Sequence, residues 1–112
     1  MPMITVYLKS DEKVLDLKKA TEEISAQTGI APEHLTLFSQ RLSPTGYYKG
    51  SGTLFPTVRV AARAGNGRET IQKLMRAAAK AVADQLQLDA ANITVYTHTI
   101  EDGNLLLGGN IL

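Results

Sequence analysis

The sequence predicts an α/β (α+β) domain in which two β-α-β units form a four-stranded sheet with both helices on one face. Three observations lead to this fold class. Apolar and polar residues alternate in four short segments, two longer segments carry apolar residues at helical spacing, and the order strand, helix, strand occurs twice. At 112 residues with 44% hydrophobic content, the chain fits one compact domain spanning 1–112.

The first half, about residues 1–41, is predicted to form a strand, a helix and a second strand. The first strand has alternating apolar positions at Ile4, Val6 and Leu8. Ser10 and Asp11 offer N-cap oxygens, and Gly29 supplies a C-terminal stop for the helix between them. Its apolar positions are Val14, Leu17, Ala20 and Ile24. The segment 35–41 alternates again and predicts the second strand.

The second half, about residues 54–99, repeats this order after a loop at 42–53 that is rich in Gly, Ser, Pro and Thr. The segment FPTVRVAAR predicts a third strand, and the turn AGNG follows it. Apolar residues at helical spacing between Ile71 and Leu86 then predict a long amphipathic helix. The alternation from Ile93 to His98 predicts the fourth strand.

The face of the predicted sheet opposite the helices has no cover within the chain. Right-handed β-α-β crossovers place both helices on the same face. The residues expected on the other face mix apolar and polar types: Thr5, Tyr7, Arg59, Ala61, Thr94 and Tyr96. Such a face favours burial against other subunits, and the tail cluster Leu105-Leu106-Leu107 is a further expected contact edge. We therefore expect an oligomer.

Composition excludes several functional classes. Twelve basic and eleven acidic residues are spread along the chain with a net charge of +1, so a nucleic-acid partner is not expected. The absence of cysteine excludes disulfides and thiolate chemistry, and two isolated histidines argue against a metal site. Without a membrane-spanning run or a signal peptide, a cytoplasmic protein with no membrane partner is expected.

The opening MPMITVYL raises a chemical question about its second residue. If Met1 is removed, Pro2 becomes a free secondary amine that can act as a base. If Met1 is retained, the Pro2 nitrogen is an amide without basicity. Pro2 could also simply begin an edge strand, where the missing N–H costs little.

The order of these features resembles the tautomerase superfamily. The features are Met-Pro directly before a strand, the duplicated β-α-β pattern, a second proline in LFPTVRV, and Gly67-Arg68 at the start of the second helix. The second half is similar to 4-oxalocrotonate tautomerase and 5-carboxymethyl-2-hydroxymuconate isomerase. The segment ATEEISAQTGIAPEHLTL resembles macrophage migration inhibitory factor. The resemblance implies trimers or hexamers with sites at subunit boundaries.

The resemblance also implies roles for four residues. Pro2 matches the catalytic proline, a general base that moves a proton within a small keto-enol acid without a cofactor. Arg68 matches the arginine that holds a substrate carboxylate. Arg63 matches a second basic position found in cis-3-chloroacrylic acid dehalogenases, and Tyr96 lies on the strand that provides pocket residues in relatives.

Simpler readings of the same residues stay open. Arg59 and Arg63 on a strand face are often interface ion-pair partners, and Arg68 could merely flank a helix start, although a cation there opposes the helix dipole. His34 and His98 are expected to be ordinary surface or interface residues. The alternative to an isomerase is a non-catalytic homotrimeric binding or structural protein of the same fold.

Overall fold

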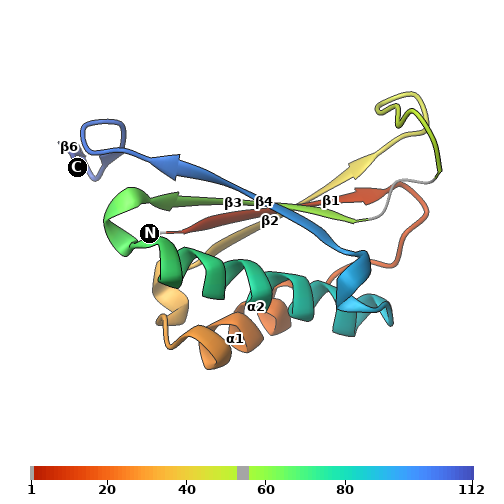
Figure 1. Cartoon of the computed structure of the whole chain (residues 1–112), viewed down its shortest axis with the longest axis horizontal. Helices are drawn as coiled ribbons and strands as arrows, with labels where there is room; N and C mark the ends of the chain where they lie inside the picture. Colours follow the sequence, from red (N-terminus) through yellow and green to blue (C-terminus); the bar gives the residue numbers. More distant parts are fainter. Residues whose placement is uncertain (1, 53–55) are drawn as a thin grey trace.

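The computed structural model describes residues 2–52 and 56–112 and confirms the predicted fold class. Figure 1 shows one four-stranded sheet with two helices on the same side of it. The sheet strands are β1 Met3–Lys9, β2 Thr36–Leu42, β3 Thr57–Arg63 and β4 Thr94–Ile100. The helices are α1 Leu17–Thr28 and α2 Arg68–Leu86. Three single turns of 3₁₀ helix are η1 Pro32–His34, η2 Ala64–Asn66 and η3 Ala90–Asn92.

The two β-α-β units meet at the centre of the sheet. The strand order is β2-β1-β3-β4, with β1 parallel to β2, β3 parallel to β4, and β1 antiparallel to β3. A proline precedes the first strand of each unit and makes the same backbone contact. The Pro2 carbonyl accepts a hydrogen bond from the Thr36 amide at 3.2 Å, and the Pro56 carbonyl accepts one from the Thr94 amide at 3.3 Å. The sequence duplication is therefore also a structural one.

The core lies between the sheet and the helices. Alternate residues of β1 and β3 point toward the helices and are almost fully buried, including Ile4, Val6, Val58 and Val60. Opposite them, α2 presents Leu74 and a set of small residues to the sheet. Alanine at these positions lets the helix approach closely, so the Ala-rich stretch of α2 is explained by packing.

Helix α1 begins later than the sequence predicted. Asp16, and not Ser10 or Asp11, is its N-cap, and the Asp16 side chain accepts a hydrogen bond from the Lys19 amide at 3.0 Å. Val14 lies before the helix and is 76% exposed, whereas helical spacing had placed it on the buried face. The predicted stop is confirmed, since Gly29 caps the C-terminus with φ of 78°.

A buried glutamine explains why the helix starts at Asp16. Gln85 in α2 accepts a hydrogen bond from the Asp16 amide and donates one to the Asp16 carbonyl, each at 2.8 Å. Both bonds join the last turn of α2 to the residue that caps α1. A tertiary contact across 69 residues of sequence thus fixes the boundary.

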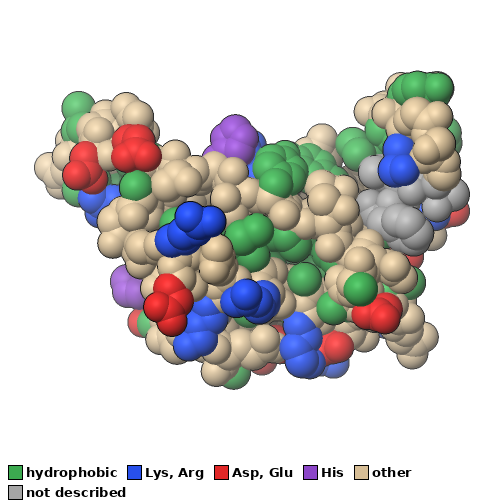
Figure 2. Space-filling model, viewed as in Figure 1, with side chains coloured by type: hydrophobic (Ala, Val, Ile, Leu, Met, Phe, Trp, Pro, Cys, Tyr) green, Lys and Arg blue, Asp and Glu red, His purple; other side chains and the backbone are tan. Residues whose placement is uncertain are grey.

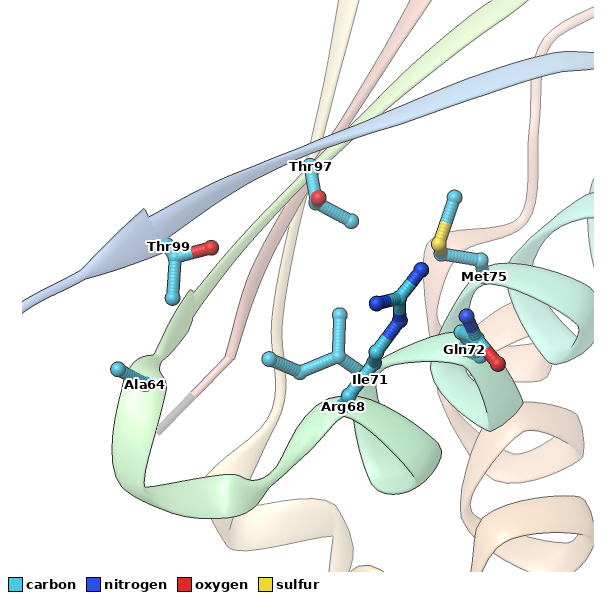
Figure 3. A pocket seen from close by; sticks show the side chains of 7 residues that line it. All are labelled: Ala64, Arg68, Ile71, Gln72, Met75, Thr97 and Thr99. Carbon is cyan, nitrogen blue, oxygen red and sulfur yellow. The ribbon is translucent and has the colours of Figure 1, made fainter.

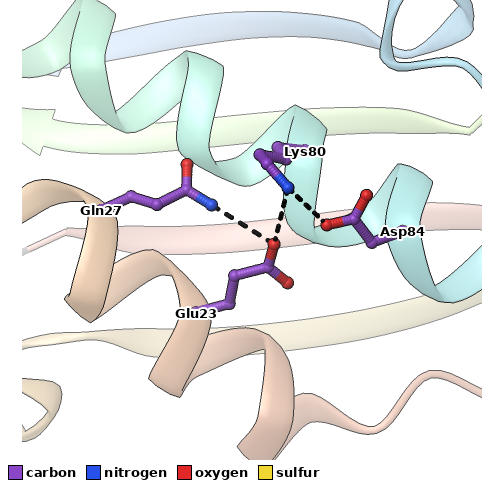
Figure 4. A network of polar contacts seen from close by, with 4 residues as sticks. All are labelled: Glu23, Gln27, Lys80 and Asp84. Carbon is purple, nitrogen blue, oxygen red and sulfur yellow. Dashed lines mark hydrogen bonds and ion pairs between the residues drawn. The ribbon is translucent and has the colours of Figure 1, made fainter.

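A polar network also joins the outer surfaces of the helices (Figure 4). Lys80 of α2 lies 2.8 Å from Asp84 on the same helix and 3.5 Å from Glu23 of α1. Gln27 donates a hydrogen bond to Glu23 at 3.3 Å. Partial burial raises the pKa of Glu23 and the neighbouring Asp84 adds to this effect, whereas the hydrogen bond from Lys80 lowers the pKa of Asp84.

The C-terminal segment forms a small hairpin. From the sequence, only an apolar contact edge was expected there and no strands. Its strands are β5 Leu106–Leu107 and β6 Asn110–Ile111. Leu106 and Ile111 are 68% and 71% exposed. The predicted loop 42–53 is described as far as residue 52, and Figure 1 shows the hairpin and this loop at opposite ends of the sheet. No helix in the described part of the chain is long and apolar enough to cross a membrane.

Candidate functional site

Arg68 lines a cavity of about 500 Å³ between α2 and the edge strand β4 (Figure 3). This volume falls within the range typical of small-molecule sites. The cavity is built by η2, the first two turns of α2 and the helix-facing side of β4. Its lining residues are Ala64, Arg68, Ile71, Gln72, Met75, Thr97 and Thr99.

The start of α2 makes this end of the cavity electropositive. Gly67 adopts φ of 84°, a backbone conformation that favours glycine, and its carbonyl accepts the Ile71 amide at 3.1 Å to open the helix. No side chain caps the helix among the described residues, so amides of the first turn stay available to a ligand. Arg68 adds a full positive charge where the helix dipole is already positive, although Glu69 beside it is acidic.

The cavity combines this positive end with apolar and hydroxyl-bearing walls. In Figure 3 the Arg68 side chain extends toward Gln72 and Met75, and the two threonines lie across from it on β4. Ile71 and Met75 offer apolar surface. An anion with a small apolar body fits this arrangement, with its carboxylate at the guanidinium of Arg68.

Thr97 and Thr99 were not named as site residues from the sequence, although the alternation of residues along β4 could have indicated them. Val95 packs against the core, so every second residue after it points toward the helices. That set contains the two threonines and excludes Tyr96. Tyr96 instead lies on the open face of the sheet, is 41% exposed, and makes an edge contact with the His98 ring at 6.0 Å between centroids.

Pro2 is buried at the same end of the sheet but does not line the cavity. Met3 pairs with Ala61, and Ala61 pairs with His98, so β1 begins beside the ends of β3 and β4. Figure 1 shows the N-terminus near the start of α2. Pro2 and Arg68 therefore lie toward the same end of the sheet, but Pro2 is not among the residues that line the Arg68 cavity. Met1 lies outside the described residues.

Arg63 does not converge with Arg68 on this cavity. One guanidinium nitrogen of Arg63 lies 3.6 Å from a carboxylate oxygen of Asp102, and the Arg63 carbonyl accepts a hydrogen bond from Asn66. Of the four predicted site residues, the structure thus places only Arg68 in the cavity. Among the described residues, no group of three or more His, Cys, Asp or Glu is arranged to hold a metal ion.

No family model and no curated protein matches the sequence. The fold, in contrast, is similar to solved structures. Fused 4-OT has a TM-score of 0.80 at 17% identity, covering 97% of this chain and 94% of its own. A fused 4-OT wild-type asymmetric trimer has a TM-score of 0.79 at 18% identity, with coverages of 97% and 94%.

Two further solved structures are also similar in fold. Pt0534 inactivated by 2-oxo-3-pentynoate has a TM-score of 0.71 at 14% identity and covers 98% of this chain and 93% of its own. N1, a member of the cis-3-chloroacrylic acid dehalogenase family, has a TM-score of 0.72 at 15% identity, with coverages of 98% and 82%. The structural neighbours are tautomerase superfamily members, and the chain has their fold.

Proposed function

We propose that this chain is a cofactor-free tautomerase that moves a proton within a small keto-enol acid. The observation that carries the proposal is the Arg68 cavity, which joins a cation that has no ion-pair partner in the described part of the chain to apolar walls, at the sheet end where β1 begins. The likeness of the fold to fused 4-OT supports it. The substrate class follows from the cavity: a small acid whose carboxylate pairs with Arg68.

In this proposal Pro2 is the general base. Removal of Met1 leaves a secondary amine whose lone pair can accept a proton from the enol hydroxyl, and the same proton, or one from solvent, is then delivered to the adjacent carbon. Burial of the amine and nearby arginines both disfavour its charged form, which brings a base toward working pH. Arg68 holds the carboxylate during the transfer and stabilises negative charge that develops on the enolate.

We further propose a homotrimer in which the open sheet faces turn inward and each site combines residues of two chains. The half-apolar open face and the exposed leucines of the C-terminal hairpin support this arrangement. It would also give Arg63 and Tyr96 a role, because residues outside the Arg68 cavity of one chain can reach the cavity of another. The trimeric state of a fused 4-OT structure is consistent with self-association.

The experiment starts with the N-terminus. Intact-mass measurement of the native protein shows whether Met1 is present, and a sample with free Pro2 is then tested for ketonisation of an arylpyruvate enol and of 2-hydroxymuconate. Pro2→Ala should lower kcat/KM by roughly 10²- to 10⁴-fold, the usual contribution of a positioned acid–base group. The matched control is the wild-type chain with Met1 retained, which should be equally inactive.

Covalent labelling tests the same assignment independently of turnover. Because Pt0534 is inactivated by 2-oxo-3-pentynoate, this compound is a suitable probe, and it should modify Pro2 once per chain. A protein with a confirmed free Pro2 that neither turns over these enols nor is labelled would defeat the catalytic assignment. In that case the alternative stands, a non-catalytic homotrimeric binding or structural protein of the same fold.

A further inference from the structure

The open face of the sheet contains a cation, Arg59, that has no counter-charge within residues 2–52 and 56–112. Arg59 occupies the middle of this face, paired in register with Thr5 on one side and Tyr96 on the other. Its Nε atom is inaccessible to solvent and has no hydrogen-bond partner among the described residues. Its terminal nitrogen Nη2 lies 3.3 Å from Nδ1 of His98, and an imidazole supplies no negative charge.

The strands themselves cannot supply the missing acid. The sequences of β1 to β4 are MITVYLK, TLFSQRL, TVRVAAR and TVYTHTI, and they contain no aspartate or glutamate. The ion pair with Asp102 is made by Arg63 at the end of β3, not by Arg59. A buried N–H is almost always satisfied, so the unpaired Nε–H of Arg59 calls for an acceptor from outside the described chain.

A small cavity lies beside this guanidinium. Its volume is about 220 Å³, and its lining residues are Met3, Thr5, Phe38, Arg59 and Ala61. Thr5 contributes a hydroxyl, whereas Met3, Phe38 and Ala61 contribute apolar surface. This set repeats, on the opposite face of the sheet, the combination of one arginine, hydroxyl and apolar wall found around Arg68.

We propose that this open-face cavity is a second anion site, distinct from the Arg68 cavity, which binds a small monocarboxylate. The carboxylate accepts hydrogen bonds from the Arg59 guanidinium and the Thr5 hydroxyl, and its apolar body lies against Phe38 and Met3. The volume limits the ligand to a small acid, with room for one ring. In a trimer with inward-facing sheets, three such sites would lie near one another, and bound anions would offset the repulsion among the three Arg59 charges.

The test uses benzoate as the probe and benzamide, which has nearly the same shape and no charge, as its control. Amide NMR spectra are recorded on Arg68→Ala protein, so that the Arg68 cavity cannot account for binding. Benzoate should shift the amide signals of Thr5, Phe38 and Ala61, and benzamide should not. Adding Arg59→Gln to this background should weaken benzoate binding by roughly tenfold to a hundredfold, as expected when a charge-assisted pair is lost.

Two additional variants guard against an unfolded Arg59→Gln protein. Arg59→Lys keeps the charge and should retain part of the affinity, whereas Thr5→Val should weaken binding modestly without changing the net charge. Equal binding of benzoate and benzamide, or affinity unchanged by Arg59→Gln, would overturn the proposal. So would an intermolecular contact, seen in the ligand-free protein, in which a neighbouring copy already supplies the acceptor to Arg59. Loss of turnover would not bear on it, because the assay reports binding only.

Discussion

At the scale of single residues, Arg68 is the side chain on which the proposed chemistry depends most directly. It is exposed, lines a cavity of about 500 Å³ and carries its charge at the positive end of α2. A cation in that position is unfavourable for the helix and favourable for an anionic ligand. Arg68 therefore lowers the stability of the helix start while it serves the proposed binding function, a combination that is common for functional residues.

Arg68→Ala should raise KM for an enol acid by roughly tenfold or more, since it removes a charged hydrogen-bonding partner of the carboxylate. If Arg68 also stabilises the enolate, kcat falls in the same variant. The helix should become slightly more stable. Arg76→Ala is the control, because Arg76 is exposed on the same helix outside the cavity. Equal steady-state kinetics for the two variants would remove Arg68 from the site.

From the sequence, single candidate residues could be named more readily than the set of residues that share one cavity. The resemblance carried by Gly67-Arg68 before the second helix singled out Arg68, and its role in binding stays a prediction. The sequence could not show whether Arg63 and Tyr96 share a cavity with Arg68. In the described chain both lie on the open face of the sheet and do not line that cavity, so their role in binding stays a prediction. Alternation along β4 contained the information that favours Thr97 and Thr99, whereas the resemblance alone did not. Whether Pro2 is catalytic stays a prediction.

At the scale of elements, the boundary between the first strand and α1 shows where local sequence signals fail. Ser10, Asp11 and Asp16 are all capable N-caps, so capping preference alone could not choose among them. Gln85 favours Asp16 over the other two, because its side chain hydrogen-bonds to both the amide and the carbonyl of Asp16. Gln85 is distant in sequence, and no local pattern links it to Asp16. Long, strongly periodic α2, by contrast, was predicted almost to its ends.

Gln85→Leu should destabilise the fold by roughly 1–3 kcal/mol, since it leaves the partly buried Asp16 amide without its partner. It also removes one of the two hydrogen bonds to the Asp16 carbonyl, which still accepts from the Ala20 amide. Urea denaturation followed by circular dichroism measures this change. Gln87→Asn is the control, because Gln87 is an exposed neighbour that makes no hydrogen bond to Asp16 among the described residues, and asparagine tolerates its positive φ of 57°. Hydrogen exchange at Asp16 should accelerate in the Gln85 variant alone. An unchanged unfolding midpoint would contradict a stabilising role for the two hydrogen bonds between Gln85 and Asp16.

The Lys80 network should make stability depend on pH. Asp84 has a lowered pKa, so its contribution is present at neutral pH and lost as pH falls through its folded value. Glu23 has a raised pKa, so its ionisation opposes folding as pH rises. Lys80→Met leaves the two carboxylates facing each other without a cation. The variant should therefore be less stable than wild type at pH 7, with the difference shrinking between about pH 5 and pH 3.

Urea unfolding of both proteins across this pH range checks the network prediction. Lys73→Met, an exposed lysine on the same helix, provides the control for loss of one positive charge. A stability difference between Lys80→Met and wild type that stays constant from pH 7 to pH 3 would contradict the prediction. It would mean that ionisation of Glu23 and Asp84 does not change the contribution of Lys80 to stability. The effect at neutral pH should be small, because these groups are largely exposed.

At the scale of the whole molecule, one face of the sheet is covered by helices and the other by nothing in the described chain. Figure 2 shows apolar and histidine side chains along the upper rim, between the two raised ends of the molecule. Tyr96 and Phe38 on the open face are 41% and 50% exposed. The sequence order predicted this two-layer architecture because crossover handedness leaves few alternatives. It could not predict how copies of the chain meet, because that depends on shapes formed only after folding.

The last prediction concerns this face. The protein should be a homotrimer at micromolar concentration, with a molar mass near three times the 12.1 kDa of the chain by light scattering. Thr5→Lys adds a second cation beside Arg59 in the middle of the open face, so it should shift the protein toward monomer. Ala26→Lys adds the same charge on the exposed side of α1 and should leave the trimer intact. The shift caused by Thr5→Lys should lessen at high salt, since screening weakens repulsion among like charges. A monomeric wild type would contradict the trimer and leave the open face as a free surface. Equal masses for the two variants would mean that the subunit contacts lie elsewhere.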